Sequence, residues 1–207
     1  MKWLGLDYDE EIMYQTKQSE KHKEAAKKLI ETGYAYHLNP GEEHSPVLFK
    51  LPYCCDGMSF VREVGPAEIE LEPNSEVALN QAGVLFHTLS HKGKSVENAA
   101  SLAGFKNLKI ADASGNVLFE LNDETIRELP ANPQEKTVVA GAAKLKFIRR
   151  EVFYHDLVKG DLAKPLDSMK DFIIVRSDGS PVFHLANVYD DMQQRVTHIV
   201  CGDDHVE

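Results

Sequence analysis

Cysteine is scarce in this chain of 207 residues, and its placement suits neither cross-links nor zinc. The three cysteines are Cys54, Cys55 and Cys201, so the count is odd and two of them are adjacent. They form neither a disulfide framework nor a C-x-x-C metal motif. Such usage is typical of the reducing cytosol, and we expect a cytoplasmic location.

Long hydrophobic runs are also missing. No apolar stretch approaches the roughly 20 residues that a membrane-spanning helix needs. The N-terminus does not show the charged, apolar and small-residue regions of a secretory signal peptide. We therefore expect no contact with a membrane.

Positive charge is in deficit: 23 Lys and Arg stand against 33 Asp and Glu, for a formal net charge of -10 at pH 7. Phosphate groups require a basic footprint, so this balance disfavours tight nucleic-acid binding by the whole surface. A local basic patch is still compatible with it. Hydrophobic residues make up 43% of the chain, an ordinary globular proportion that can bury a core.

The stretch that organises the chain lies near its end. Phe172–Val175 is a continuous apolar run, as expected of a strand buried on both faces. Ser177–Pro181 predicts a turn, and apolar residues at helical spacing predict a helix from Val182 to Val196. Ile199–Cys201 predicts a second buried strand. An open α/β sheet builds its ligand crevice at strand ends of this kind.

This stretch resembles the nucleotide-binding domain of class I glutamyl- and glutaminyl-tRNA synthetases. The matching sequence covers Arg176–Gly179, Phe183–Val188, Asp190–Asp191 and Thr197–His205. The N-terminus resembles the segment of the same family that leads into its connecting peptide. Its matching pieces are Trp3–Glu10, Tyr14–Thr16 and Gly33–Tyr36.

The N-terminal part predicts one helix and two strands. The helix begins at Thr16 or Ser19 and ends near Thr32, before Gly33. Short strands follow at residues 34–38 and 47–51. By resemblance, the second of these strands pairs with residues 151–160, which match an Asp-Leu-Val-Arg-Gly-like family sequence.

The middle of the chain has no match to the family but is patterned for folding. A short helix capped by Ser95 is expected at Val96–Ala103. The remaining expected elements are strands at 58–64, 67–71, 84–86, 108–111, 117–121, 136–140 and 144–148.

We therefore predict an α/β fold: a partial, Rossmann-like class I synthetase nucleotide-binding domain with an inserted, β-rich α+β subdomain. Residues 1–53 and 150–207 would form the partial catalytic-domain and connecting-peptide unit, and residues 54–149 the insert. This prediction requires that the two ends of the chain share one sheet. The open edge of such a partial sheet is a route to a homodimer.

The resemblance implies a ligase that attaches glutamate to the acceptor end of tRNA, using ATP with magnesium. The chain contains neither class I signature, the His-Ile-Gly-His-like turn or the Lys-Met-Ser-Lys-Ser-like loop. We therefore expect an internal piece of a synthetase that is inactive alone. The alternative is a non-catalytic module that binds tRNA or another protein, and glutaminyl specificity also stays open.

The resemblance also assigns a substrate site. Phe183, Asn187 and Cys201 occupy glutamate-binding positions, and Gly202, Asp204 and His205 lie where the family approaches ATP. Cys201 departs from the family pattern, because the usual residue is an Arg that binds a substrate carboxylate, which Cys cannot do.

For several of these residues, a structural role is the competing interpretation. Cys201 in an apolar run is more typically a small core residue. Asp190 and Asp191 are expected on the helix surface or as caps, because neighbours on a helix point about 100° apart. His198 is expected to be a structural, hydrogen-bonded histidine, and no metal site is expected, since Asp203, Asp204 and His205 are adjacent and lack a fourth ligand.

One basic cluster is a candidate for tRNA contact, and it consists of Lys144, Lys146, Arg149 and Arg150. Residues 144 and 146 share one face of the expected strand, so a stripe of two lysines is predicted. The competing interpretation is an edge strand that carries lysines to prevent aggregation.

Overall fold

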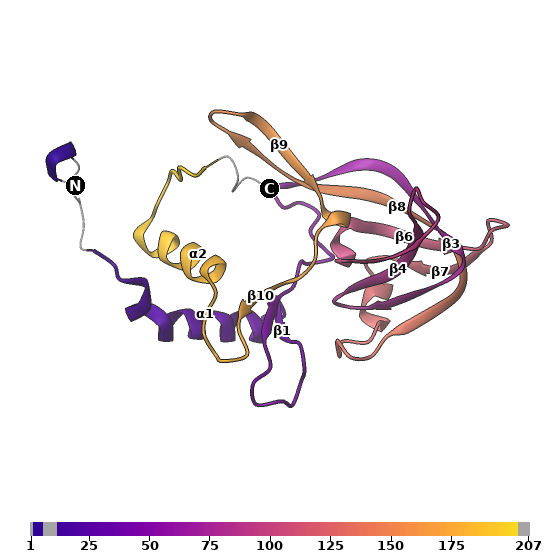
Figure 1. Ribbon diagram of the computed structural model, residues 1–207, viewed down its shortest axis with the longest axis horizontal. Coiled ribbons are helices and arrows are strands. Elements are labelled where there is room, and N and C mark those ends of the chain that lie inside the picture. Colours follow the sequence, from indigo (N-terminus) through magenta and orange to yellow (C-terminus); the bar gives the residue numbers. More distant parts are fainter. Residues whose placement is uncertain (1, 6–11, 203–207) are drawn as a thin grey trace.

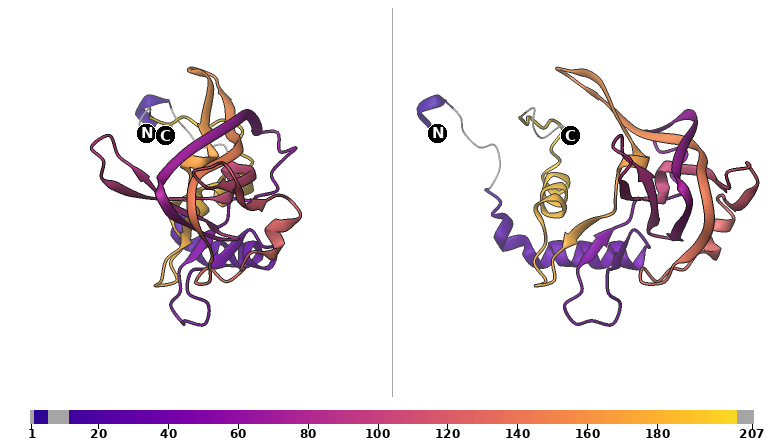
Figure 2. Two further views of the ribbon diagram at one scale, coloured as in Figure 1. Left: turned by 90° about the vertical axis from the view of Figure 1, so that its right-hand side faces the viewer. Right: turned by 45° about the vertical axis from the view of Figure 1, so that its right-hand side comes forward.

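The structure is a computed structural model that describes residues 2–5 and 12–202. Of the N-terminal block at residues 3–10, positions 6–10 lie outside the described residues. Figures 1 and 2 show an elongated, curved molecule with a small helical unit at one end and a large curled sheet at the other.

The small unit is a three-stranded antiparallel sheet with two helices. Strand β10 pairs with β2, with Phe172 opposite Phe49 and Ile173 opposite Leu48, and β2 pairs with β1. The prediction that both ends of the chain share one sheet is confirmed. The elements are α1 (Ser19–Glu31), β1 (Ala35–His37), β2 (Val47–Phe49), β10 (Phe172–Val175) and α2 (Phe183–Gln194).

Both helices predicted for the two ends of the chain are present. Helix α1 is followed by Gly33 at φ +80°, the left-handed conformation that favours glycine after a helix. Gln18 is the N-cap and makes no side-chain cap hydrogen bond, so the cap expected from Thr16 or Ser19 is not formed. The core beneath α1 consists of Ala26, Ala35, Val47, Ile174, Val175 and Leu185.

The large sheet is antiparallel and curls around its own core. Its strand order is β5-β4-β3-β8-β6-β7, and β9 pairs with the far end of β8. The longest pair, β3 and β8, is interrupted by register shifts, which bend and twist a sheet. The strands are β3 (Val61–Asn80), β4 (Gly83–Leu89), β5 (Ser95–Ala100), β6 (Phe105–Ala111), β7 (Val117–Leu121), β8 (Thr137–Asp156) and β9 (Gly160–Pro165).

Aromatic and aliphatic side chains form the core enclosed by this curled sheet. Phe105, Leu108, Ile110 and Leu145 are each fully buried. The rings of Phe105 and Phe147 lie 4.6 Å apart, a contact distance at which aromatic pairs stabilise a core. The curled sheet therefore has a hydrophobic core of its own.

The helix predicted at Val96–Ala103 is wrong. Residues 95–100 form β5, with Val96 opposite Thr88 and Ala100 opposite Val84. Ser101, not Ser95, is the capping residue, and it opens a single turn at Leu102–Gly104. A helix would have left the backbone of β4 unpaired on that side, and pairing outweighed the local capping signal.

Two strand predictions also need correction. Residues 151–156 pair with β3 and β9 rather than with β2, because β3 offers a long antiparallel partner. The boundary predicted at 149/150 therefore falls inside β8. Ile199–Cys201 is not a strand, since Val200 is 97% exposed and no described strand lies beside it to accept its hydrogen bonds.

Asp171 lies where the small sheet joins the curled sheet. The backbone N–H of Leu51 donates to its Oδ1 at 3.0 Å, and nearby the N–H of Ser101 donates to the carbonyl of Met169 at 2.8 Å. Burial raises the pKa of Asp171 to about 6, against the opposing effects of the Leu51 N–H and of nearby Lys50. The junction therefore holds a carboxyl that folding makes harder to ionise.

This shift predicts how stability depends on pH. The raised pKa means that, between about pH 4 and about pH 6, the folded protein holds a proton that the unfolded chain has released. The contribution of Asp171 to the free energy of unfolding therefore decreases as the pH rises from about 4 to about 6, and it stays reduced at higher pH. Asp171→Asn keeps an oxygen that accepts from Leu51 but removes the charge. We expect it to raise the free energy of unfolding by about 1–3 kcal/mol above pH 6, measured by urea unfolding.

The matched control is Asp123→Asn, at an exposed position. It should leave the free energy of unfolding within about 0.5 kcal/mol of the parent at each pH. A loss of stability in Asp171→Asn at neutral pH would contradict the account of the junction.

Candidate functional site

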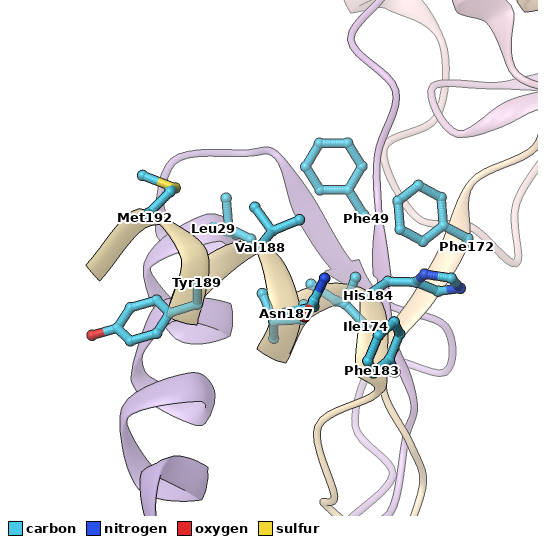
Figure 3. Close-up of a pocket in the computed structure, with 11 residues that line it drawn as sticks. Leu29, Phe49, Phe172, Ile174, Phe183, His184, Asn187, Val188, Tyr189 and Met192 are labelled. Carbon is cyan, nitrogen blue, oxygen red and sulfur yellow. The ribbon is translucent and has the colours of Figure 1, made fainter. Parts of the chain in front are cut away.

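An apolar pocket of about 620 Å³ lies along α2 (Figure 3). Leu29 of α1 and the neighbouring, mutually tilted rings of Phe49 and Phe172 form part of its wall. Asn187 lies among these apolar side chains (Figure 3). The lining is completed by Ile174, Phe183, His184, Leu185, Val188, Tyr189 and Met192.

A tight turn sets the direction of α2. Gly179 adopts φ +78°, and the N–H of Ser180 donates to the Asp178 carboxylate at 2.8 Å. The N–H of Val182 then donates to the Ile174 carbonyl, which ties the start of α2 to β10. The sequence Ser-Asp-Gly-Ser-Pro therefore folds the helix back beside the strand that precedes it.

Only part of the apolar face of α2 is covered. Leu185 packs in the core with residues of the sheet and Ala186 is buried, whereas Phe183 is 65% exposed and Met192 71% exposed. Single exposed apolar residues are ordinary, but a cluster of them around a pocket marks a binding surface.

Two of the three predicted glutamate-binding residues meet in this pocket. Phe183 and Asn187 both line it, together with His184, whose ring packs against Phe172 at 6.1 Å. An amide can donate to and accept from a polar ligand, and the surrounding rings offer apolar contact. Of the residues described, no Lys or Arg lines the pocket, so it holds no fixed cation for a carboxylate.

Cys201 lies elsewhere. It lines a separate pocket of about 490 Å³ between the tip of the β8–β9 hairpin and the segment 197–201. It is exposed, which corrects the expectation of a small core residue. Gly202 is exposed beside it, and Asp203, Asp204 and His205 lie outside the described residues. His198 is hydrogen-bonded as expected, to Thr197 Oγ1 at 2.9 Å, although it is exposed.

The basic cluster is neutralised within the fold. Lys144 donates to Glu68 at 2.7 Å, and Lys146 lies 3.8 Å from the same carboxylate. Arg149 forms a bidentate pair with Asp167. The strand is paired on both sides, so the interpretation as an edge strand is wrong for these residues.

Arg150 must be removed from the tRNA-contact candidates. Its side chain is fully buried, over the ring of Tyr53 at 5.1 Å and 3.5 Å from Asp56 Oδ1. The inward alternation of β8 changes phase here, opposite a register shift in β3. A change of phase in a strand turns a surface residue into a core residue.

A buried pair that the sequence did not predict links α1 to α2. His22 Nε2 lies 2.7 Å from Asp190 Oδ1, and the amide of Gln15 donates to Asp190 Oδ2 at 3.4 Å. The expectation that Asp190 lies on the helix surface is therefore wrong. A signal was available, because His22 falls on the same stripe as Ala26 and Leu29 at helical spacing.

Metal and membrane sites find no support in the described ranges 2–5 and 12–202. No group of three or more His, Cys, Asp or Glu side chains there is arranged to hold a metal ion. Within the same ranges, no helix has the length and apolarity to cross a membrane.

Comparison with known proteins gives a consistent set of relatives. The chain is 29% identical over 208 residues to a glutamate–tRNA ligase of Neisseria meningitidis serogroup A, covering all of this chain and 32% of that protein. It is 27% identical to the glutamate–tRNA ligases of Desulfotalea psychrophila and Lawsonia intracellularis, again over all of this chain and 30% of each relative. The chain thus spans about a third of the length of these curated relatives.

A family model agrees with them. The model for tRNA synthetases class I (E and Q), catalytic domain, matches residues 1–44 and 114–207, about two thirds of the chain. These two blocks contain α1, β1, β10 and α2 of the small unit, but not β2, and they also contain β7, β8 and β9 of the curled sheet. The match at residues 114–149 corrects the expectation that the whole middle of the chain has no match to the family. The chain belongs to the catalytic-domain family of the class I glutamyl- and glutaminyl-tRNA synthetases.

Proposed function

We propose that this chain is the central portion of a glutamyl-tRNA synthetase-like protein, which attaches glutamate to tRNA with ATP and magnesium. The observation that carries the proposal is the meeting of Phe183 and Asn187 in one pocket, in a member of this family. The matched relatives are named as glutamate–tRNA ligases, which supports glutamate as the amino acid.

In this proposal the pocket along α2 receives the amino acid. The Asn187 amide hydrogen-bonds the polar end of glutamate, and the Phe183 ring bounds its aliphatic part. Cys201, which the resemblance assigns to the glutamate site, lines a different pocket and makes no contact with glutamate in this proposal; by resemblance, Gly202, Asp204 and His205 approach ATP. Because Cys201 supplies no guanidinium, the substrate carboxylate has to be paired by a cation outside the described lining.

The proposal also covers domain organisation. The small unit is part of a Rossmann-like catalytic domain and the curled sheet is the connecting peptide, with the second boundary after β9 instead of at residue 149, because β8 and β9 both belong to the curled sheet. The hydrophobic core of the curled sheet supports an insert that folds as a unit. Long insertions are tolerable because the closure cost rises by only about 0.6 kcal/mol per doubling of length.

The 207 residues alone do not form an aminoacyl-adenylate in this proposal. Class I enzymes stabilise charge on the phosphates from two signature sequences, and neither occurs here. The second candidate is a non-catalytic module that binds tRNA or a protein. Cys201 favours it, since Cys does not supply the guanidinium that pairs a substrate carboxylate in the family.

We also propose a cytosolic location and self-association through the edge of the small sheet. The three cysteines are free, which supports the cytosol. Strand β10 is an edge of the small sheet, and Phe172 and Ile173 on it are 39% and 44% exposed. Such an edge can pair with a second copy of the chain.

Glutamate binding is testable on the chain itself. L-glutamate titrated into the ¹⁵N-labelled protein should shift the Asn187 side-chain amide resonances with saturation. Asn187→Ala should weaken this binding about tenfold or more, the effect of a lost hydrogen bond to a charged group. Glutamate-dependent exchange of pyrophosphate into ATP should be absent in both proteins.

The matched control is Asn98→Ala on β5, which should bind glutamate as the parent does. A larger response to L-glutamine would reassign the specificity. No response of Asn187 to either amino acid would reject the substrate pocket, and exchange activity of the chain alone would reject the proposed inactivity.

Contact with tRNA through β8 is testable by salt dependence. If Lys146 and Arg149 contact phosphates, each Ala substitution should weaken tRNA binding for all sequences and lower the salt slope by about 1. Lys27→Ala, on the exposed face of α1 and paired with Glu31, is the control. Equal losses in all three variants would show a non-specific effect of charge and contradict this interface.

A further inference from the structure

The buried pair of His22 and Asp190 has no part in the proposed contacts with substrate. His22 is 2% exposed and Asp190 9% exposed, and their polar atoms lie 2.7 Å apart. The His22 ring also meets the edge of the Tyr189 ring at 5.5 Å. Burying a carboxylate and an imidazole is unfavourable unless they bond each other, so this geometry is selective for one arrangement of the helices.

Helix α2 has few other anchors. Its first turn is tied to β10 through the Val182 N–H, and its buried residues are Leu185, Ala186 and Asp190. Val188 and Met192, further along, are 59% and 71% exposed. The second half of α2 therefore contacts α1 through His22, by way of the Asp190 carboxylate and the Tyr189 ring.

The pair also fixes how α2 is rotated about its axis. Asn187 lies one turn before Asp190, so any roll of the helix that moves one side chain moves the other. Apolar contacts such as those of Leu185 tolerate a small roll, whereas a short hydrogen bond between buried polar groups does not. The orientation of the Asn187 amide is thereby coupled to a residue of α1.

We propose that His22 and Asp190 are positioning residues that hold α2 in the rotation that presents Asn187 and Phe183 to the pocket. The identity of the ligand rests on the proposed function, but the effect on helix α2 does not. Loss of the pair also lowers the preference between L-glutamate and L-glutamine, because that preference depends on which atom of the Asn187 amide faces the ligand.

The test compares two substitutions of one residue by hydrogen exchange. His22→Leu removes the donor and leaves the Asp190 carboxylate buried without it, whereas His22→Gln retains an N–H donor. We expect amide exchange across residues 185–192 to rise about tenfold or more in His22→Leu and to stay within about threefold of the parent in His22→Gln. Exchange at Leu145, in the curled sheet, should be unchanged in both.

A second readout is the Asn187 side chain. Its amide resonances should lose dispersion in His22→Leu and recover in His22→Gln. If His22→Leu does not fold, Asp190→Asn replaces it, because a neutral amide retains a weaker acceptor; exchange in α2 should then rise about threefold or more.

Several results would overturn the proposal: unchanged exchange in α2, an equal rise in α2 and the curled sheet, or failure of His22→Gln to restore the parent behaviour. The titration of the parent protein with L-glutamate separates the two proposals. If the parent protein does not bind glutamate while His22→Leu increases amide exchange in α2, the proposed function is rejected and the positioning role is supported.

Discussion

The structure depends on one short antiparallel pairing, between Val47–Phe49 of β2 and Phe172–Val175 of β10. This pairing joins the two ends of the chain and places α1 and α2 beside the same sheet. There the rings of Phe49 and Phe172 lie 5.4 Å apart and form part of the pocket wall. The chain between the two strands is long, and closing it costs entropy that grows only logarithmically. The curled sheet, with its own core, makes this arrangement tolerable because the intervening chain is itself ordered.

Periodicity in the sequence predicted most of the elements. The helix ending before Gly33 and the hairpin strands near 108–121 follow from local patterns that match their final environment. Phe172–Val175 forms the predicted strand, but the expectation that it is buried on both faces is wrong, because it is the edge of the small sheet and Phe172 and Ile173 are 39% and 44% exposed. The wrong predictions share one cause: a local sequence pattern does not specify which strand, if any, the segment will pair with. The residues after Ser95 had a helix-capping signal but pair with β4 as a strand. Ile199–Val200 had the pattern of a strand, but no described strand lies beside it.

The site was less predictable than the fold. Phe183 and Asn187 were assigned by resemblance, and periodicity alone would not have separated them from Cys201, which lies in another pocket. Asp190 is bonded to a residue 168 positions away, so no local rule gives its direction. Arg150 was misplaced because one change of phase in β8 reverses which side chains face the core. The positions of the polar site residues therefore depend on tertiary contacts, whereas those of the apolar residues follow from the periodicity of burial along the chain.

The most direct measurement is a cross-link across the central pairing. Cysteines introduced by Leu48→Cys and Ile173→Cys, with Cys54, Cys55 and Cys201 replaced by Ser, occupy opposite positions of β2 and β10, at a separation that suits a disulfide. The account predicts that mild oxidation links this pair and leaves Leu48→Cys with Val152→Cys unlinked, since residue 152 pairs with β3 and β9. A link in the second pair and none in the first would show that the ends of the chain do not share a sheet.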